Sequence, residues 1–398
     1  MAGSLDGIRV LDLTNVLSGP FCCHQLAHFG AEVIKIERPG KGDLARQLGA
    51  DPALNAANMG VSFLAQNAGK KSVTLNLKTP AGVALFKKLV ATADVVVENF
   101  RPGVMDRLGV GFEDLKPLNP RLVYCAISGF GQDGPMRAMP AYDQIVQGLS
   151  GVMSVTGDVE SAPLRVGYPV ADTIGGLTAA FAITASLAGP RKAPVFLDVS
   201  MLEATLATMG WVVSNWLIAG QTPAAHGNEN TTSAPSGAFQ ARDGALNIAA
   251  NKDEQWEALC EILGRADLLS DPDYATRETR KANRYALRAE IEKSLTARDA
   301  ADWVALFSAK GIPSGEILTV PQALDQPQVA GRGMIADFAD VPGVGRAIKT
   351  VRTGIKVNGA PPCVDTPPPV LGRDNADVYR ALGLDDDDLR SLEQEGAI

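Results

Sequence analysis

The chain has 398 residues, of which 46% are hydrophobic and 21% charged, and its formal net charge is −8. This composition is that of a globular protein of one or two domains, and it excludes a disordered, collagen-like or disulfide-rich chain. The acidic balance disfavours non-specific nucleic-acid binding, although a local basic patch can still hold a small anionic ligand.

The cysteines and histidines give no sign of a metal site. The five cysteines are odd in number and form no C-x-x-C pair, which argues against a zinc ribbon or a disulfide framework. His24 and His28 lie four residues apart, but HQLAH lacks the glutamate of H-E-x-x-H and no third ligand is evident. The start MAGSLDGIRV has no basic segment before an apolar run, so we expect no signal peptide and a cytoplasmic protein.

The first 220 residues alternate between apolar strands and helices. Strands are predicted at 9–13, 31–37, 72–77, 94–97, 122–127 and 195–199. Helices are predicted at 19–29, 80–92, 142–152, 173–188 and 200–219. This alternation indicates an α/β fold with an open, mainly parallel, Rossmann-like sheet covered on both faces.

Two uncharged runs, Thr173–Gly189 and Ala204–Gly220, have 17 residues each, just short of the roughly 20 that span a membrane. They contain Gly, Thr, Ser and Asn. We therefore interpret them as helices that are buried on all sides. So much buried helix in one chain also indicates contact with a second subunit.

Composition changes near residue 221, where QTPAAHGNENTTSAPSG is polar and rich in turn-forming residues. A smaller α+β domain is expected after it, with strands at 237–241 and 245–250 and helices at 253–263, 282–295 and 298–309. The tail predicts a helix pair, and the acidic run Asp385–Asp388 fits a helix N-terminus, where the helix dipole favours negative charge.

The first strand–helix–strand unit does not predict a nicotinamide site. Its turn, LTNVLSGP, has one glycine where G-x-G-x-x-G needs three to let a pyrophosphate approach. Glu37 is then expected to be a solvated strand end. Arg38 beside it is better suited to face a phosphate or to stack on an adenine.

Two loops follow later strands. VENFRPG (97–103) would place Asn99, Phe100 and Arg101 at the carboxyl edge of the sheet, where such folds bind ligands. Phe100 is equally suited to the core, and Arg101 to a surface ion pair. SGFGQDGP (128–135) either directs amides toward an oxyanion or simply turns the chain.

Asp172 stands in RVGYPVADTIGG, directly before the apolar helix. Aspartate is a preferred N-cap residue, and the local pattern favours a cap over a catalytic role. The two roles are compatible, because Gly175 and Gly176 leave space for a bulky group and a half-desolvated carboxylate can act as a covalent nucleophile. No Ser–His–Asp or Cys–His arrangement is specific enough to indicate a hydrolase.

Several segments, taken in order, resemble the family III CoA-transferases (the CaiB–BaiF family, which includes formyl-CoA transferase and carnitine CoA-transferase). They are LDGIRVLDLTNVLSGPFCCHQLAHFGAEVIKIERPGKGDLAR, TLNLKTPAG, VVVENFRPGVMDRLGVG, ISGFGQDGP, PVADTIGG and PPPVLGRDNADVYRALGL. The resemblance covers essentially the whole chain. It implies a large α/β domain built from both chain ends, a small inserted domain, and two subunits interlocked like links of a chain. The domains expected on this basis are a large domain at 1–220, a linker at 221–236, a small domain at 237–330, and a return to the large domain at 331–398.

The resemblance also implies site residues. Asp172 takes the place of the family's nucleophilic aspartate. The resemblance therefore implies a catalytic role for this residue, whereas the local pattern favours an N-cap. The implied reaction transfers CoA from an acyl-CoA to a carboxylic acid through an aspartyl anhydride and an aspartyl-CoA thioester, with CoA and acyl-CoA as substrates and without a metal, redox or permanently bound cofactor. The residues that match the family's CoA contacts are Val16, Leu17, Ser18, Arg38, Leu75, Asn99, Phe100 and Arg107.

Two other functions share this fold. Acyl-CoA racemases of the family use a histidine in a GHD motif, but this chain has Ala141-Tyr142-Asp143 there, and a tyrosine is a poor base at neutral pH. A non-catalytic acyl-CoA-binding module would bind CoA without turnover, which the intact match around Asp172 argues against.

The acceptor is expected to be a small dicarboxylic acid. Formyl-CoA transferase has a glutamine where this chain has Leu17, a lysine near the position of Pro140, and a tetraglycine loop where this chain has NTTSAPSGAFQARDG. These departures disfavour oxalate. Succinyl-CoA is the expected donor, with citramalate, mesaconate, itaconate, glutarate or a sulfinate analogue as acceptor.

Overall fold

The computed structural model describes residues 3–398, which form two compact units. Unit 1 comprises the chain up to Val152 together with Arg165–Gln221 and Pro327–Ile398, and unit 2 comprises Met153–Leu164 and Thr222–Gln326. Unit 2 therefore takes in a short segment before residue 221 that the expected range 237–330 leaves out. It belongs there because the amide of Gly227 donates to the carbonyl of Gly157 (2.6 Å).

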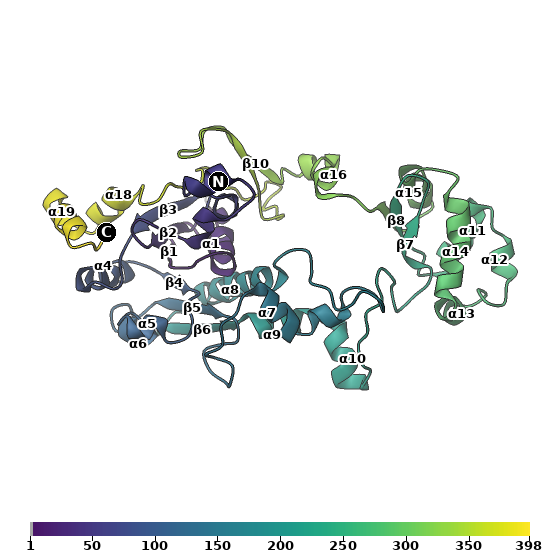
Figure 1. The fold of residues 1–398 in the computed structure, drawn as a ribbon, viewed down its shortest axis with the longest axis horizontal. Coiled ribbons are helices and arrows are strands. Elements are labelled where there is room, and N and C mark those ends of the chain that lie inside the picture. The colour runs from purple at the N-terminus through teal and green to yellow at the C-terminus, as the bar shows by residue number, and fades with distance from the viewer. Residues whose placement is uncertain (1–2) are drawn as a thin grey trace. The chain divides into compact units, whose positions relative to one another are not determined.

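Unit 1 is built on a six-stranded sheet in which every neighbouring pair is parallel, as predicted (Figure 1). The strand order is β3-β2-β1-β4-β5-β6, so the chain direction across the sheet reverses between β1 and β4. The strands are β1 Arg9–Asp12, β2 Glu32–Glu37, β3 Lys70–Thr74, β4 Val95–Glu98, β5 Val123–Ser128 and β6 Val195–Ser200. In open sheets of this kind, ligands bind outside the carboxyl ends of the strands at that reversal.

Alternate strand residues point to two hydrophobic cores, one on each face of the sheet. Val10, Val95 and Cys125 belong to the core on the side of α1 (Ser18–His28) and α8 (Val170–Ala188). Val96 and Tyr124 belong to the opposite core, with α4 (Pro80–Val90). Because both faces are covered, the strands are apolar throughout, which explains why their sequence signal was strong.

The remaining elements of unit 1 are short. They are α2 Pro52–Ala56, α3 Val61–Leu64, α5 Val104–Arg107, α6 Phe112–Leu115, α7 Asp143–Leu149, α9 Met201–Thr208, α10 Trp211–Ala219, α17 Pro327–Gly331, α18 Asn375–Arg380 and α19 Asp386–Gln394, with the hairpin β10 Ile335–Phe338 and β11 Ile348–Val351. The predicted helix at 200–219 is two helices, because Gly210 takes a positive φ between them. The acidic run lies at the start of α19, with Asp385 as its N-cap, as predicted.

The C-terminal segment covers the outer edge of β3 (Figure 1). Ser72 and Thr74 donate their amides to the side chains of Asp374 and Asn375 (2.7 and 2.8 Å). The buried hydroxyl of Tyr379 donates to the carbonyl of Thr74 (2.7 Å). An edge strand whose backbone groups are satisfied in this way is protected from pairing with other chains.

The prediction that both apolar runs are buried on all sides is wrong for a single chain. Phe181 on α8 is 74% exposed, and Trp211 and Ile218 on α10 are 80% and 86% exposed. No residue of α10 is buried. Within residues 3–398, α8 is the one helix long and apolar enough to cross a membrane, and its inner face packs on α1 in the core of unit 1.

Unit 2 contains a three-stranded antiparallel sheet with the order β7-β8-β9. Its elements are β7 Ser236–Gln240, β8 Ala245–Ala249, β9 Ser314–Glu316, α11 Asp253–Leu263, α12 Asp267–Ser270, α13 Arg277–Ala282, α14 Arg284–Leu295, α15 Ala300–Ala309 and α16 Val320–Leu324. The buried guanidinium of Arg280 donates to the carbonyls of Ala234 and Tyr274 and to the carboxylate of Asp253. Strand β9 was not predicted, since three residues with a central glycine carry no strand pattern.

Candidate functional site

A pocket of about 260 Å³ lies at the carboxyl ends of the first four strands of the sheet. Three of the predicted CoA contacts, Arg38, Leu75 and Phe100, line it together. The full lining is Leu13, Asn15, Ile36, Glu37, Arg38, Gly42, Leu75, Asn76, Leu77, Lys78, Phe100 and Leu108. Side chains that follow four different strands meet here because parallel strands end at one edge.

The charged groups in this pocket favour an anion. Arg38 and Lys78 are exposed, and neither forms an ion pair with any described residue. Glu37, in contrast, is buried and accepts two bonds from the Arg46 guanidinium (2.6 and 2.7 Å). The expectation that Glu37 is a solvated strand end is therefore wrong. Lys78 was missed, although it lies inside the segment TLNLKTPAG.

The pocket lies where the strand order of the sheet reverses, between β1 and β4. Two asparagines that hydrogen-bond to each other join the two halves of the sheet at this place. Asn99 follows β4 and Asn15 follows β1. The Asn99 carboxamide accepts from the Asn15 amide (2.8 Å) and donates to the Asn15 carbonyl (2.9 Å). Its Nδ2 also lies 3.3 Å from the Ser18 hydroxyl. Asn99 thus joins the two halves of the sheet at the edge where ligands bind.

A smaller pocket of about 60 Å³ adjoins the other side of the VENFRPG loop. Asn99, Phe100 and Arg101 line it together with Ser128 and Phe130. Arg107 is exposed at the end of α5 and lines neither pocket. Seven of the eight predicted contacts therefore lie at the carboxyl edge of the sheet or in the turns that follow it, whereas Arg107 lies one short helix away.

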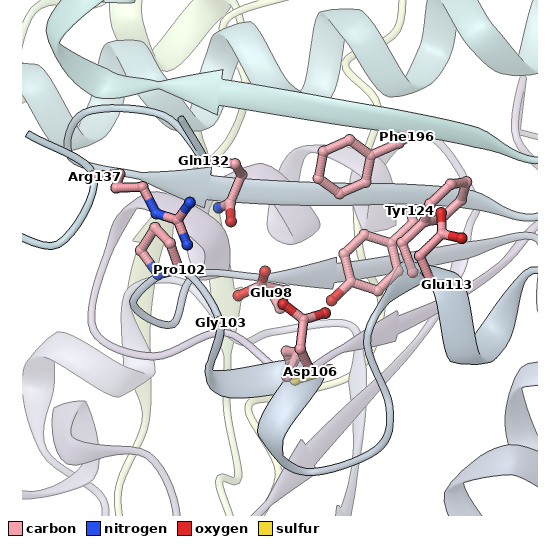
Figure 2. A pocket seen from close by; sticks show the side chains of 11 residues that line it. Glu98, Pro102, Gly103, Asp106, Glu113, Tyr124, Gln132, Arg137 and Phe196 are labelled. Carbon is pink, nitrogen blue, oxygen red and sulfur yellow. The ribbon is translucent and has the colours of Figure 1, made fainter. Parts of the chain in front are cut away.

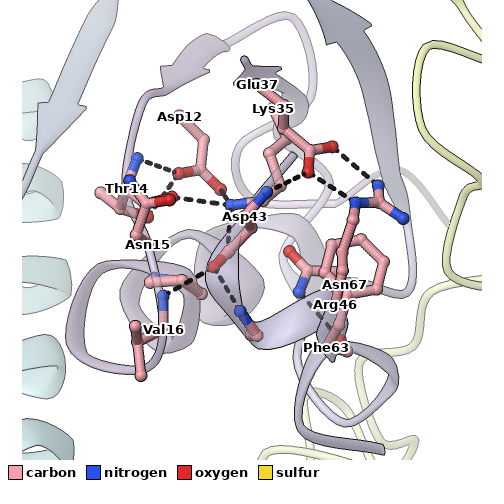
Figure 3. Close-up of polar contacts among 12 residues, drawn as sticks. Asp12, Thr14, Asn15, Val16, Lys35, Glu37, Asp43, Arg46, Phe63 and Asn67 are labelled. Carbon is pink, nitrogen blue, oxygen red and sulfur yellow. Dashed lines mark hydrogen bonds and ion pairs between the residues drawn. The ribbon is translucent and has the colours of Figure 1, made fainter. Parts of the chain in front are cut away.

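A network of buried charges supports the turn between β1 and α1 (Figure 3). Asp12 pairs with Lys70 (2.8 Å), and Asp43 pairs with Lys35 (2.9 Å). Burial alone would raise the pKa of Asp12 and of Asp43, but the neighbouring lysines outweigh it and hold both pKa values below the usual range. All of these side chains are buried. Four buried charges are costly to desolvate, and they hydrogen-bond to Thr14 and Val16 of the turn and to Pro20 in the first turn of α1.

Asp172 is not the N-cap of its helix, contrary to the prediction from the local pattern. Helix α8 begins at Val170, so Asp172 lies in its first turn. The capping group is the carboxylate of Asp143 on α7, which accepts from the amides of Ala171 (2.8 Å) and Asp172 (3.3 Å). Because a neighbouring helix supplies the cap, the Asp172 carboxylate is left without a hydrogen-bonding role in the backbone.

The surroundings of Asp172 oppose its ionisation. Burial raises the pKa of Asp172 to about 7, and the nearby charge of Asp143 adds to this effect. Within residues 3–398, no cation forms an ion pair with Asp172. A carboxylate that is desolvated and unpaired near neutral pH is more nucleophilic than one that is solvated or held in a salt bridge.

Helix α8 packs against the start of α1 about one helical turn after Asp172. A Cβ built on Gly176 would lie 2.3 Å from the carbonyl oxygen of Ser18, so only glycine lets the two helices approach this closely. Asp172 precedes Gly176 by four residues and lies on about the same face of the helix, about 6 Å away along the helix axis. Gly175 similarly packs against Met201. The prediction that these glycines leave room for a ligand is wrong, since protein atoms fill the space.

Two amides of the glycine-rich loop 128–135 are already occupied. The amide of Gly131 donates to the Ser128 hydroxyl (3.0 Å), and that of Gln132 donates to Asp198 (2.9 Å). These bonds fix the loop as a turn of the chain. They occupy two of the loop amides that could otherwise donate to an oxyanion.

A larger pocket of about 350 Å³ is lined mainly by β4, β5 and the α5–α6 segment (Figure 2). Glu98, Asp106 and Glu113 line it, with Arg137 as the single lining cation. Burial raises the pKa of Glu98 to about 8. A pocket with three acidic side chains does not suit a polyphosphate ligand, so the pocket beside Arg38 and Lys78 is the better candidate.

The histidine pair is internal. His24 and His28 are both buried, their Nε2 atoms lie 3.2 Å apart, and burial lowers the pKa of each. Among residues 3–398, no group of three or more His, Cys, Asp or Glu side chains is arranged to hold a metal ion. Both histidines lie on the buried side of α1, and neither lines the pocket beside Arg38.

Comparison with known proteins identifies the class. The family model for CoA-transferase family III matches residues 5–375, and the chain belongs to that family. It is an enzyme of the CoA-transferase type.

Individual relatives differ in their substrates. An acetyl-CoA:oxalate CoA-transferase from Acetobacter aceti is 41% identical over 87% of this chain and 89% of that protein. A succinyl-CoA:glutarate CoA-transferase from Mus musculus is 36% identical over 99% of this chain and 90% of that protein. Among solved structures, a CAIB/BAIF family protein from Brucella suis has a TM-score of 0.85 and 32% identity over 96% of this chain and all of that one.

Proposed function

We propose that the protein transfers CoA from an acyl-CoA donor to a small dicarboxylic acid, with Asp172 as the covalent carrier. The observation that carries this proposal is the position of Asp172. Its half-buried carboxyl, with a pKa near 7, lies on the helix face that touches the turn at the carboxyl edge of the sheet. Seven of the eight other predicted contacts lie at the carboxyl edge of the sheet or in the turns that follow it, and Arg107 lies one short helix away.

The reaction divides into steps that each exchange one acyl bond. The Asp172 carboxylate attacks the donor thioester, which forms a mixed anhydride and releases CoA thiolate. The thiolate attacks the aspartyl carbonyl, which forms an aspartyl-CoA thioester and releases the donor acid. The acceptor carboxylate then attacks this thioester to give a second anhydride, and CoA thiolate takes the acceptor acyl group and regenerates the Asp172 carboxylate.

Each step passes through an oxyanion, and the start of α1 offers donors for it. Leu17 precedes the helix without a side-chain cap, so the first-turn amides of Ser18 and Gly19 are not occupied by a capping side chain. The positive end of the helix dipole lies at the same place. Unpaired amides that face a developing oxyanion stabilise it more strongly than water does.

The basic pocket is assigned to the nucleotide part of CoA. Arg38 has a planar guanidinium suited to stacking on the adenine, and Lys78 adds a charge for a phosphate. Leu75 and Phe100 supply apolar contact. Arg107 is assigned to a phosphate outside this pocket. Val16, Leu17 and Ser18 then lie between the nucleotide and Asp172, where the pantetheine arm must pass.

Succinyl-CoA is the proposed donor, and the acceptor is a dicarboxylic acid. The support comes from relatives along the whole chain that are named for succinyl-CoA with glutarate or D-citramalate, and from one named for acetyl-CoA with oxalate. Leu17 is apolar where formyl-CoA transferase has glutamine, which favours an acceptor longer than oxalate. We also propose a cytoplasmic enzyme that binds no permanent cofactor.

An interlocked homodimer is proposed as the working form. The support is the apolar surface on α8 and α10, which a single chain leaves exposed. Aromatic side chains such as Trp211 and Phe181 are enriched at the centres of protein interfaces. A second copy of the chain is the occupant that the family architecture implies.

The test is intact-mass analysis after incubation with succinyl-CoA and an acid or thermal quench. We expect a CoA-sized adduct on the wild type that hydroxylamine removes, and none on Asp172→Ala. Asp143→Asn is the matched control, because it changes a neighbouring carboxylate while its oxygen can still accept from the Ala171 and Asp172 amides, which leaves the carrier in place. An adduct that persists on Asp172→Ala, or none on either protein with any of several acyl-CoAs, would sink the covalent mechanism.

The acyl-CoA racemase reading is tested in the same preparation. Tyr142 occupies the position of the racemase histidine and is 70% exposed, and a tyrosine is in general a poor base at neutral pH. We therefore expect no deuterium wash-in at the α-carbon of a 2-methylacyl-CoA in the absence of an acceptor acid.

A further inference from the structure

Val16 has a backbone conformation that its side chain opposes. Its φ is +68°, in the left-handed region. Of the described residues other than glycine, Asn58 and Asn358 share a positive φ, and asparagine tolerates it well. For a β-branched residue the same conformation is strained, and strain of this kind persists only where surrounding contacts enforce it.

Contacts on both sides of Val16 enforce its conformation. The side chains of Asp43 and Asn99 bind the peptide group before it, and after it the Leu17 carbonyl is held by the helix, where it accepts from the Phe21 amide (2.8 Å). Asp43 accepts from the Val16 amide (3.0 Å), as Figure 3 shows. Asn99 accepts from the Asn15 amide and donates to the Asn15 carbonyl. The peptide groups before and after Asn15 are therefore both held in fixed orientations, and the second of them leads into Val16.

Asp43 is itself held rigidly. Its side chain is buried, its second oxygen lies 2.9 Å from Lys35 Nζ, and its first oxygen also accepts from the Ala45 amide (2.9 Å). Its own amide donates to Glu37 (3.0 Å). A carboxylate with these partners cannot turn away from Val16 without losing an ion pair in the interior.

The conformation of Val16 determines where α1 begins. The helix starts at Ser18, two residues later, and Ser18 packs against α8 at Gly176, about one turn after Asp172. Asn15, one residue earlier, lines the basic pocket. A change of φ at Val16 would therefore redirect the first amides of α1 relative to the pocket.

We propose that Asp43 is a positioning residue for CoA binding, which acts by holding Val16 in its left-handed conformation. This inference rests on the proposed function, because it takes the β1–α1 turn as part of the CoA site. The alternative is that Asp43 only stabilises the buried charge network. The two differ in one respect: only the first depends on the side chain at position 16.

Glycine at position 16 separates them, since glycine adopts a positive φ without strain. The variants are Val16→Gly, Asp43→Ala and the two combined, since alanine removes the acceptor oxygen that binds the Val16 amide. The matched control is Asp12→Ala, alone and with Val16→Gly. Asp12 belongs to the same charge network but bonds to Thr14 and Lys70 and makes no contact with Val16. The readouts are the Kd for free CoA by calorimetry and the Tm of each apo protein.

We expect Asp43→Ala to weaken CoA binding about tenfold, the scale of one hydrogen bond to a charged group. Val16→Gly combined with Asp43→Ala should bind within roughly threefold of Val16→Gly alone. Asp12→Ala should show no such recovery when glycine is introduced. Should Asp43→Ala fail to fold, Asp43→Glu, which keeps the charge opposite Lys35 but displaces the carboxylate from Val16, takes its place.

The proposal is overturned if the double variant binds CoA as weakly as Asp43→Ala, or if glycine rescues Asp12→Ala equally well. A wild type that does not bind CoA would instead overturn the proposed function. The Tm values need no ligand and still report whether Val16→Gly offsets the loss of Asp43. The two failures are therefore distinguishable.

Discussion

Asp143 contacts Asp172 through the backbone and repels it through its charge. One oxygen of Asp143 accepts from the amides of Ala171 and Asp172, and the other accepts from the Gln147 carboxamide (2.7 Å). Burial is the main cause of the raised pKa of Asp172, and the negative charge of the Asp143 carboxylate is the second cause. Asp143 therefore fixes the start of α8 and also sets how readily Asp172 ionises.

Asp143→Asn should separate these two effects. Asparagine can still accept from the two amides, but it carries no charge, so the pKa of Asp172 should fall. In a profile of kcat/KM against pH, the acidic limb should move down by roughly one unit, the scale of a nearby like charge. Asp143→Ala also loses the cap, so its Tm should fall more. An unmoved acidic limb in Asp143→Asn would show that the charge does not act on Asp172.

Asp172→Asn should stabilise the protein at alkaline pH. The pKa of Asp172 rises from 3.8 to about 7 on folding, so the folded state holds its proton more tightly. Stability is therefore lost as pH rises through this window, and the full cost is present above about 7. We expect Asp172→Asn to raise the free energy of unfolding by roughly 1–3 kcal/mol at pH 8.5 and by almost nothing at pH 4. Urea unfolding at both pH values measures this, and equal effects at both would contradict the raised pKa.

Glu98→Gln tests the second buried acid in the same way. Burial raises the pKa of Glu98 from 4.5 to about 8, with smaller contributions from the charges of Asp106 and Asp198. Its bond from the Phe100 amide (2.7 Å) needs only an acceptor oxygen, which glutamine retains. At pH 9 the free energy of unfolding of Glu98→Gln should exceed that of the wild type by roughly 1–3 kcal/mol, whereas at pH 4.5 the two values should be equal. Glu113→Gln, which changes an exposed acid of the same pocket, is the control and should show neither effect.

Removing a pocket cation should weaken CoA binding. Arg38→Ala and Lys78→Ala each take one positive charge from the basic pocket, and we expect the Kd for CoA to rise about tenfold at low salt. The difference should shrink as salt is added, because exposed charges are screened. Lys88→Ala removes an exposed cation from α4, away from the pocket, and should leave the Kd unchanged. Equal losses in all three would mean that only net charge matters.

Charges on α10 should dissociate the proposed dimer. Sedimentation of the wild type should give twice the 41.8 kDa of one chain. Trp211→Glu combined with Ile218→Glu places two carboxylates in the exposed apolar surface, and this variant should sediment as one chain at micromolar concentration. Tyr285→Glu, which changes an exposed aromatic residue of unit 2, should sediment like the wild type. A wild type that sediments as a single chain would contradict the dimer.

The sheet could be predicted from sequence because its strands are buried on both faces and each is followed by turn residues. The six strands of unit 1 lie within two residues of their expected starts, from Arg9 in β1 to Val195 in β6. The short elements β9, β10 and β11 could not be predicted, because three or four residues carry too little pattern. Their positions depend on pairing with distant segments.

The site was predictable only in part. Arg38, Asn99 and Phe100 could be predicted because they follow strands at the carboxyl edge of the sheet, where ligands bind. Asp172 was predicted to be catalytic only from the resemblance of its motif to the family. Spacing alone suggested a cap at Asp172, because no local pattern shows that Asp143, 29 residues earlier, supplies it. The role of Asp43 is likewise invisible in sequence, since it depends on a backbone angle at Val16.

The covering of β3 by Asp374, Asn375 and Tyr379 has a consequence for synthesis. Unit 1 needs the last residues of the chain to close the edge of its sheet, whereas every residue of unit 2 has been made by Gln326. Domains generally fold as units while the ribosome is still working. The smaller unit can therefore finish first, whereas the edge of β3, the strand that leads into Leu75 and Lys78 of the pocket, stays open until Asp374, Asn375 and Tyr379 have been made.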